Sequence, residues 1–103
     1  MSDDFIAVAA MSDLPPGQMI RVAVDGQPVM LANVDGDFFA LRDVCGHRSA
    51  PLSRGRLDGC QVECPLHYAL FDVRTGHFID GPLSADVATR EVRTEAGTIY
   101  VKR

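Results

Sequence analysis

Two short motifs, each with one cysteine and one histidine, carry the most chemical information in the sequence. The first motif is Cys45–His47, and the second, Cys64–His67, begins 19 residues after Cys45. Thiolate sulfur and imidazole nitrogen are good ligands for zinc, iron and copper, and one loop that offers both can bind a metal centre. If the fold brings the two loops together, they supply four candidate ligands: Cys45, His47, Cys64 and His67.

A structural zinc site is the simplest interpretation of two cysteines and two histidines. Zinc sites usually place about two to four residues between paired cysteines and about three to five between paired histidines. Here each pair mixes Cys with His, and only Gly46 separates Cys45 from His47. This mixed order favours two metals side by side over one tetrahedral ion. A zinc-stabilised, non-redox interaction domain remains an alternative.

The two motifs and their flanking residues resemble the cluster-binding loops of Rieske iron–sulfur proteins. The resemblance implies that Cys45 and Cys64 bind one iron of a [2Fe–2S] cluster, and that His47 and His67 bind the other iron. It is close over about residues 43–83 and loose elsewhere. The segments that carry it are His47–Gly55, Cys64–Tyr68, Phe71-Asp72, Thr75-Gly76 and Gly81-Pro82.

The elements that must position these loops are predicted to be β-strands. No stretch has sustained helical periodicity, and the apolar or alternating segments are short and end at Gly, Pro or Asp. Asp25-Gly26 and Asp35-Gly36 are tight-turn signals between such segments. Pro51 and Gly55 predict that residues 43–57 form an irregular first cluster loop. The expected strands are 5–10, 18–24, 28–34, 37–42, 61–63, 68–73, 87–93 and 98–102.

We therefore expect an all-β fold for the 103 residues, in a single Rieske domain over 1–103. The resemblance implies a Rieske-like antiparallel β-sandwich base with an inserted cluster-binding subdomain of two loops. The base sheets are expected at about 1–42 and 84–103, and the subdomain at about 43–83.

Charge and composition indicate which partners the protein can bind and in which compartment it is expected. The net charge of −4 argues against nucleic acid, whose phosphates require a basic surface. No segment approaches the length of a membrane span, and Asp3 and Asp4 stand where a signal peptide would carry basic residues. We expect a cytoplasmic monomer. Cys60 is left without a ligand role, and a structural disulfide is not expected.

The ligand count predicts an electron carrier and not an oxygenase. The chain has three histidines, so only His77 remains for a second iron site, which cannot be built from one histidine. The chain is similar to Rieske ferredoxins of aromatic-ring dioxygenase systems, which pass single electrons from a flavin-dependent ferredoxin reductase to a terminal Rieske oxygenase. The alternatives are a carrier for another monooxygenase or demethylase and a small Rieske-like subunit of an assimilatory nitrite reductase.

The sequence also predicts a low reduction potential. Two ferric ions, two sulfides and two thiolates form a neutral oxidised core when both histidines are neutral, and Rieske centres span about −150 to +300 mV. High-potential members of the family bridge their loops with two extra cysteines, where this chain has Ala50 and Leu66. They also carry hydroxyl side chains at the positions of Ala69 and Phe71, which have none. We expect a potential near the lower end of the range.

A docking surface is expected around the two histidines. Electron transfer needs close approach and quick release, so the interface should be small. Tyr68 and Phe71 are expected to pack the subdomain, and His77 to lie on the surface. The residues assigned to the docking surface or the surroundings of the ligands are Gly46, Arg48, Leu66, Tyr68, Pro82 and Leu83.

Overall fold

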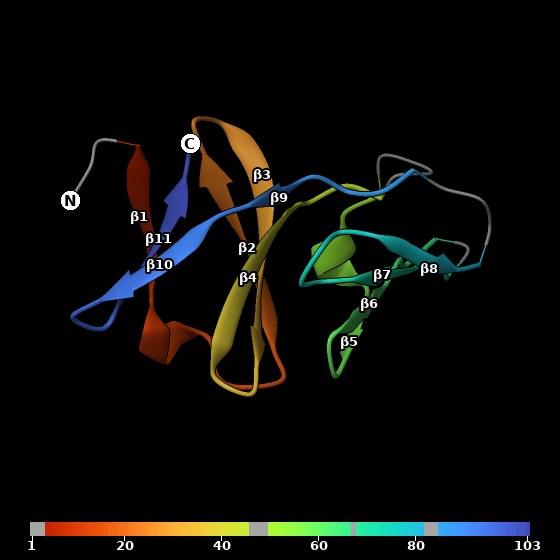
Figure 1. Cartoon of the computed structure of the whole chain (residues 1–103), viewed down its shortest axis with the longest axis horizontal. Helices are drawn as coiled ribbons and strands as arrows, with labels where there is room; N and C mark the ends of the chain where they lie inside the picture. The colour runs from red at the N-terminus through yellow and green to blue at the C-terminus, as the bar shows by residue number, and fades with distance from the viewer. Residues whose placement is uncertain (1–3, 46–49, 67, 82–84) are drawn as a thin grey trace.

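Three antiparallel β-sheets form the computed structural model, which describes residues 4–45, 50–66, 68–81 and 85–103 (Figure 1). No α-helix occurs within these ranges, and the predicted all-β fold is confirmed. The first sheet has the order β1 (Phe5–Ala10), β11 (Thr98–Lys102), β10 (Val92–Glu95). The second has the order β2 (Met19–Val24), β3 (Gln27–Val34), β4 (Asp37–Arg42), β9 (Thr89–Arg90). The third has the order β5 (Arg56–Asp58), β6 (Gln61–Glu63), β7 (Leu70–Asp72), β8 (Phe78–Asp80).

Tight Asp-Gly turns set the register of the second sheet. Asp25 and Gly26 have φ values of 50° and 79°, and Asp35 and Gly36 have values of 53° and 96°. Positive φ at both central residues is the geometry of a two-residue type I′ hairpin, which matches the twist of the strands. The turns pair Val24 with Gln27 and Val34 with Asp37, so both hairpins predicted from Asp-Gly are confirmed.

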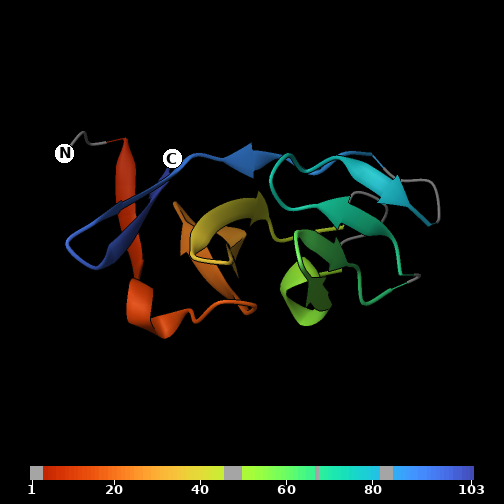
Figure 2. The ribbon, with the colours of Figure 1, turned by 60° about the horizontal axis from the view of Figure 1, so that its bottom comes forward.

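The middle sheet is buried on both faces, and this places the two other sheets. Along β3, Val29 and Leu31 face a core that includes Ile99 and Val101 of the first sheet. Met30 and Ala32 face the opposite core, which holds the third sheet's buried residues. Figures 1 and 2 show the resulting order, with the β2-β3-β4 sheet between the β1-β11-β10 sheet and the β5-β6-β7-β8 sheet.

Two short strands and one 3-10 helix occupy segments that were expected to be irregular. Helix η2 (Leu52–Arg54) and part of β5 fall within the predicted loop 43–57, and β8 was not predicted. Leu57 pairs with Val62, and Phe71 with Phe78, so these strands depend on pairing with neighbours more than on their own sequence.

The predicted strand 87–93 is in fact two strands that belong to different sheets. β9 pairs with β4 in the middle sheet, whereas β10 pairs with β11 in the first sheet. The segment therefore connects the two sheets, which explains its weak alternation in the sequence. A second 3-10 helix, η1 (Met11–Asp13), follows β1. Among the described residues, no helix has the length and apolar character needed to cross a membrane.

A glycine at the end of η2 sets how closely the chain approaches β6. A Cβ atom on Gly55 would overlap the carbonyl oxygen of Glu63, a backbone atom that cannot rotate away. Gly55→Ala should therefore lower the free energy of unfolding by about 1–3 kcal/mol, as overpacking does, in urea denaturation.

Gly17→Ala is the matched control. A Cβ at Gly17 meets nothing within 4 Å, although its φ of +82° adds backbone strain. Equal losses for the two variants would show that the contact between Gly55 and Glu63 is not tight.

Candidate metal centre

The fold brings two of the four predicted ligands into contact inside the protein. Cys45 follows β4 and is 5% exposed, and Cys64 follows β6 and is 0% exposed. Both are free thiols, and their side chains are hydrogen-bonded to each other. Residues from two separate loops therefore bring a pair of candidate sulfur ligands together.

Each cysteine begins a loop that is closed by a backbone hydrogen bond of the same form. The Cys45 N–H donates to the carbonyl of Ala50, and the Cys64 N–H donates to the carbonyl of Ala69, both at 2.8 Å. Each bond spans five residues, and each closed loop contains one of the predicted histidines, His47 or His67. The two loops are thus equivalent in backbone closure as well as in ligand order.

Both predicted histidine ligands lie outside the described residues, as do Gly46, Arg48, Pro82 and Leu83. Among the described residues, no group of three or more His, Cys, Asp or Glu side chains converges on a possible metal position. A four-ligand site therefore depends on His47 and His67, and their assignment stays a prediction.

The surroundings of the two sulfurs are apolar. Burial, followed by the hydrogen bond with Cys45, raises the pKa of the Cys64 thiol to about 11. The backbone N–H of Leu66 hydrogen-bonds to Cys64 and acts in the opposite direction. The Cys64 thiol therefore keeps its proton near neutral pH unless a cation replaces it. Two buried sulfurs suit zinc or an iron–sulfur group and do not suit a hard ion such as Mg²⁺. The residues packed around them include Ala50, Leu52, Val62, Ala69 and Phe71.

The second loop exposes apolar side chains at the surface. Leu66 is 46% exposed and Tyr68 is 68% exposed, with Tyr68 at an uncommon φ of 60°. The expectation that Tyr68 packs the subdomain is therefore wrong, because the turn of the backbone directs its side chain outwards. Phe71 is fully buried and stacks edge-on against Phe78 with ring centroids 6.0 Å apart, as expected for a packing residue.

The segment that leads to Pro82 is fixed against the second loop. Gly81 has a φ of +107°, and a Cβ atom there would lie 2.9 Å from the Cα of Ala69. Only glycine fits this close approach without a shift of the backbone. The approach places the residue before Pro82 beside Ala69, the residue that closes the second ligand loop.

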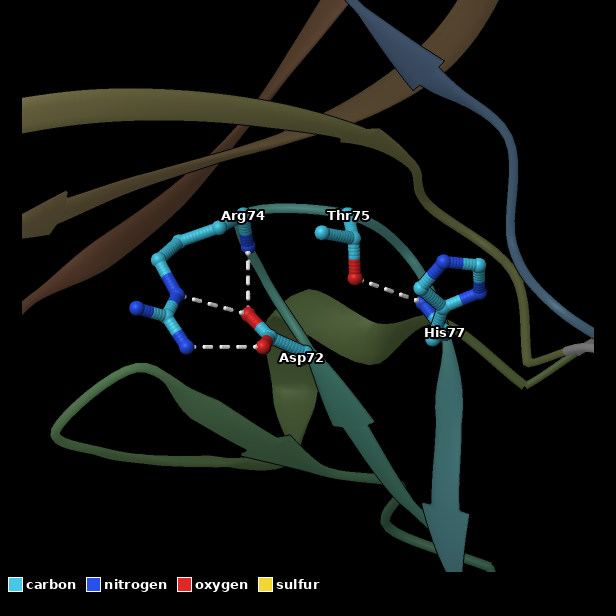
Figure 3. Close-up of polar contacts among 4 residues, drawn as sticks. All are labelled: Asp72, Arg74, Thr75 and His77. Atoms are coloured by element: carbon cyan, nitrogen blue, oxygen red, sulfur yellow. Dashed lines mark hydrogen bonds and ion pairs between the residues drawn. The ribbon is translucent and has the colours of Figure 1, made fainter.

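The β7–β8 turn is organised by the carboxylate of Asp72 (Figure 3). This carboxylate accepts hydrogen bonds from the Arg74 backbone N–H at 2.9 Å and from the Arg74 side chain at 3.1 and 3.0 Å. These bonds lower the pKa of Asp72, with the Arg74 side chain as the first cause. The His77 N–H donates to the Thr75 hydroxyl at 3.2 Å. These hydrogen bonds fix the turn that joins β7 to β8.

The remaining histidine and cysteine lie away from the sulfur pair. The His77 side chain is mostly exposed, and its Nδ1 lies 2.9 Å from Asp86, which agrees with the predicted surface position. Cys60 is half-buried and packs against the core next to the β5–β6 turn.

One buried acidic residue near the site was missed by sequence reasoning. Asp43 lies two residues before Cys45, is almost fully buried, and accepts hydrogen bonds from Ser53. Its position between a strand and a ligand loop was a usable signal, but the sequence predicts for Asp43 only the first position of the irregular loop 43–57.

Comparisons with known proteins agree with this geometry. The family model described as "Rieske [2Fe-2S] domain" matches residues 4–91. The ferredoxin component of the naphthalene 1,2-dioxygenase/salicylate 5-hydroxylase systems of Ralstonia sp. is 36% identical over 102 residues, which covers 99% of this chain and 98% of the relative.

Solved ferredoxin structures have the same fold over nearly the whole chain. The ferredoxin of carbazole 1,9a-dioxygenase from Nocardioides aromaticivorans IC177 superposes with a TM-score of 0.93 at 31% identity, covering 97% of this chain and 98% of that one. A chain from the complex of reduced oxygenase and oxidized ferredoxin in carbazole 1,9a-dioxygenase has a TM-score of 0.91 at 36% identity, covering 98% and 94%.

Replacing a buried sulfur ligand should abolish the metal centre. In Cys64→Ala, we expect loss of the visible absorption and of bound iron and acid-labile sulfide, because one iron loses a ligand that no neighbour replaces. Cys60→Ala is the control, and it should keep the visible absorption, the bound iron and the acid-labile sulfide. A purified wild-type protein that is colourless and holds one zinc ion per chain would instead support the zinc alternative.

Proposed function

The chain belongs to the Rieske [2Fe–2S] family, and from this membership we propose that it carries single electrons from a flavin-dependent ferredoxin reductase to a terminal Rieske oxygenase of the aromatic-ring dioxygenase type. The observation that supports the role is similarity over almost the full length to a protein named as a ferredoxin component. A solved relative is a ferredoxin in complex with its oxygenase, which supports the oxygenase as partner. The reductase is part of the proposal.

The [2Fe–2S] cluster of the family fits the sulfur pair of this chain. We propose that Cys45 and Cys64 hold one iron and that His47 and His67 hold the other. When bound, the cluster supplies one-electron redox chemistry. The two thiols are buried, face each other and have an apolar environment, which is a suitable donor set for it.

The protein's own residues would keep this centre dry and fixed. Leu52, Val62 and Phe71 exclude water from the sulfur side. The closed loops at Cys45 and Cys64 limit how far the ligands can move when the charge of the centre changes. A carrier needs both properties, since it must change charge without rearranging or reacting with water.

We further propose a single domain over 1–103, with the cluster-binding subdomain at about 43–83 and a cytoplasmic, monomeric protein. The strands of the third sheet all lie between Arg56 and Asp80, which supports this division. Cys60, the cysteine without a proposed ligand role, is a free thiol, which supports a reducing compartment.

The surroundings of the two cysteines predict a low reduction potential. The Cys45 and Cys64 N–H groups donate to the carbonyls of Ala50 and Ala69 and are not available to a sulfur atom, whereas the Leu66 N–H does hydrogen-bond to Cys64. Ala69 and Phe71 are buried and have no hydroxyl to offer. Hydrogen bonds to sulfur raise the reduction potential, and this centre has few of the donors that could form them. We therefore expect a midpoint potential of about −150 mV, measured by spectroelectrochemical titration. A midpoint well above zero would contradict this part of the proposal.

Electron transfer to the oxygenase should depend on the apolar tip of the second loop. Leu66→Asp places a charge at a small, partly apolar interface, so we expect the transfer rate in stopped-flow experiments with a dioxygenase terminal component to fall several-fold. The visible spectrum should not change.

Met11→Asp provides the matched control for the docking surface. Met11 is 37% exposed, similar to Leu66, but it lies in η1 next to the first sheet. Figure 1 shows that sheet at the far end of the molecule from the third sheet. If both variants transfer electrons as the wild type does, the proposed docking surface is wrong.

A further inference from the structure

Asp43 places a buried negative charge beside the first ligand loop. Its side chain is 0% exposed. One carboxylate oxygen accepts the Ser53 N–H at 2.7 Å, and the other accepts the Ser53 hydroxyl at 2.6 Å. The second oxygen also lies 3.5 Å from Nε of Arg21, whose side chain is 53% exposed. The carboxylate therefore has partners for both oxygens and one counter-charge that is half in water.

The bonds of Asp43 connect the base to the first ligand loop. Its own N–H donates to the carbonyl of Pro28 in β3 at 3.0 Å. Its carboxylate holds Ser53 in η2, and Arg21 belongs to β2. Asp43 therefore fixes where the chain leaves the middle sheet, two residues before Cys45.

The same contacts extend to the second ligand loop. Helix η2 ends at Arg54, and the backbone of the next residue, Gly55, packs against the carbonyl of Glu63. Glu63 directly precedes Cys64. A shift of Ser53 would therefore move the backbone that precedes the second sulfur ligand. One carboxylate positions both loops.

The charge of Asp43 also lies close enough to act on the centre itself. Two residues of chain separate the Cα atoms of Asp43 and Cys45 by at most about 7 Å. A fixed negative charge on a residue this near to a candidate ligand in the chain, removed from water, disfavours the addition of an electron to a neutral oxidised core. Arg21 opposes this effect, but more weakly, because its guanidinium is partly hydrated and screened.

We propose that Asp43 is a positioning residue that ties both ligand loops to the base, and that the Asp43–Arg21 pair sets the reduction potential of the cluster through opposite electrostatic contributions. This inference rests on the proposed function. The electron enters the core without forming or breaking a bond, so charge is the quantity that the pair acts on.

Two charge-removing variants test the electrostatic part of the proposal. Asp43→Asn keeps an oxygen that accepts the Ser53 N–H and an amide that can donate to the Ser53 hydroxyl, and it removes the negative charge. Its midpoint potential should shift to a more positive value. Arg21→Gln should shift the potential to a more negative value, by less, and the shift should shrink at high salt. Loss of packing alone would not shift the midpoint potentials of the two variants in opposite directions.

Arg93→Gln is the control for the loss of a positive charge. Arg93 is 55% exposed and is paired with Glu91 at 3.2 Å, like Arg21 with its own acid, but it belongs to β10 in the first sheet. The midpoint potential of the Arg93→Gln variant should equal that of the wild type.

Ser53→Ala tests the positioning part, because it removes the hydroxyl bond and leaves the charge in place. We expect this variant to lose iron to a chelator faster than the wild type, measured from the decay of the visible absorption. If iron loss is unchanged, the positioning role is refuted.

The outcomes separate the two levels of inference. Potentials of Asp43→Asn and Arg21→Gln that shift in the same direction, or do not shift, would overturn the electrostatic role while the proposed function stands. If the Asp43→Asn variant does not assemble a cluster, the direction of the potential shift in Arg21→Gln still tests the electrostatic role: a positive shift or no shift would overturn it. A wild-type protein that takes up no iron refutes the proposed function, and this inference with it.

Discussion

The structure depends on the burial of two thiols against each other. Cys45 and Cys64 are 19 residues apart in the sequence, and their side chains meet in an apolar core that is shared by the second and third sheets. Two thiolates in such a place would repel each other strongly, and two thiols would contribute little beyond their packing. A cationic group bound between them would make the arrangement favourable, because it would replace the protons and join the two loops.

The rest of the fold can be understood as the support for this contact. The middle sheet contributes buried residues to both cores and serves as the base of the fold. The first loop begins where β4 of this sheet ends. Helix η2 and β6 then bring the second loop back to the same point, with close backbone approaches at Gly55 and Gly81. The matching backbone bonds at Ala50 and Ala69 close the loops without using any side chain. A centre that changes only its charge needs this kind of fixed surroundings.

Much of the fold was predictable because local signals agree with tertiary structure. The Asp35-Gly36 turn and the apolar strands on each side of it are encoded within a few residues, and they appear as predicted. β5 and β8 were missed because each has three residues and is defined by its neighbour across the sheet. The segment after residue 86 was read as one strand, although its two halves pair with different sheets.

The site shows the same division between local and non-local information. Residue type and spacing predicted Cys45 and Cys64 as ligands, and the fold brings these two side chains together. The exposure of Tyr68 follows from a positive φ that the sequence did not reveal, since Tyr rarely adopts it. Asp43 was missed because its importance comes from Ser53 and Arg21, partners that are 10 and 22 residues away along the chain.

A reductive titration of the purified, anaerobic protein tests the central claim most directly, because it counts electrons and metal in one sample. We predict two irons and two acid-labile sulfides per chain, with the visible absorption bleached by the uptake of one electron per chain. A protein that takes up no electron, or that holds zinc in place of iron, would contradict the assignment of a redox-active cluster to these loops.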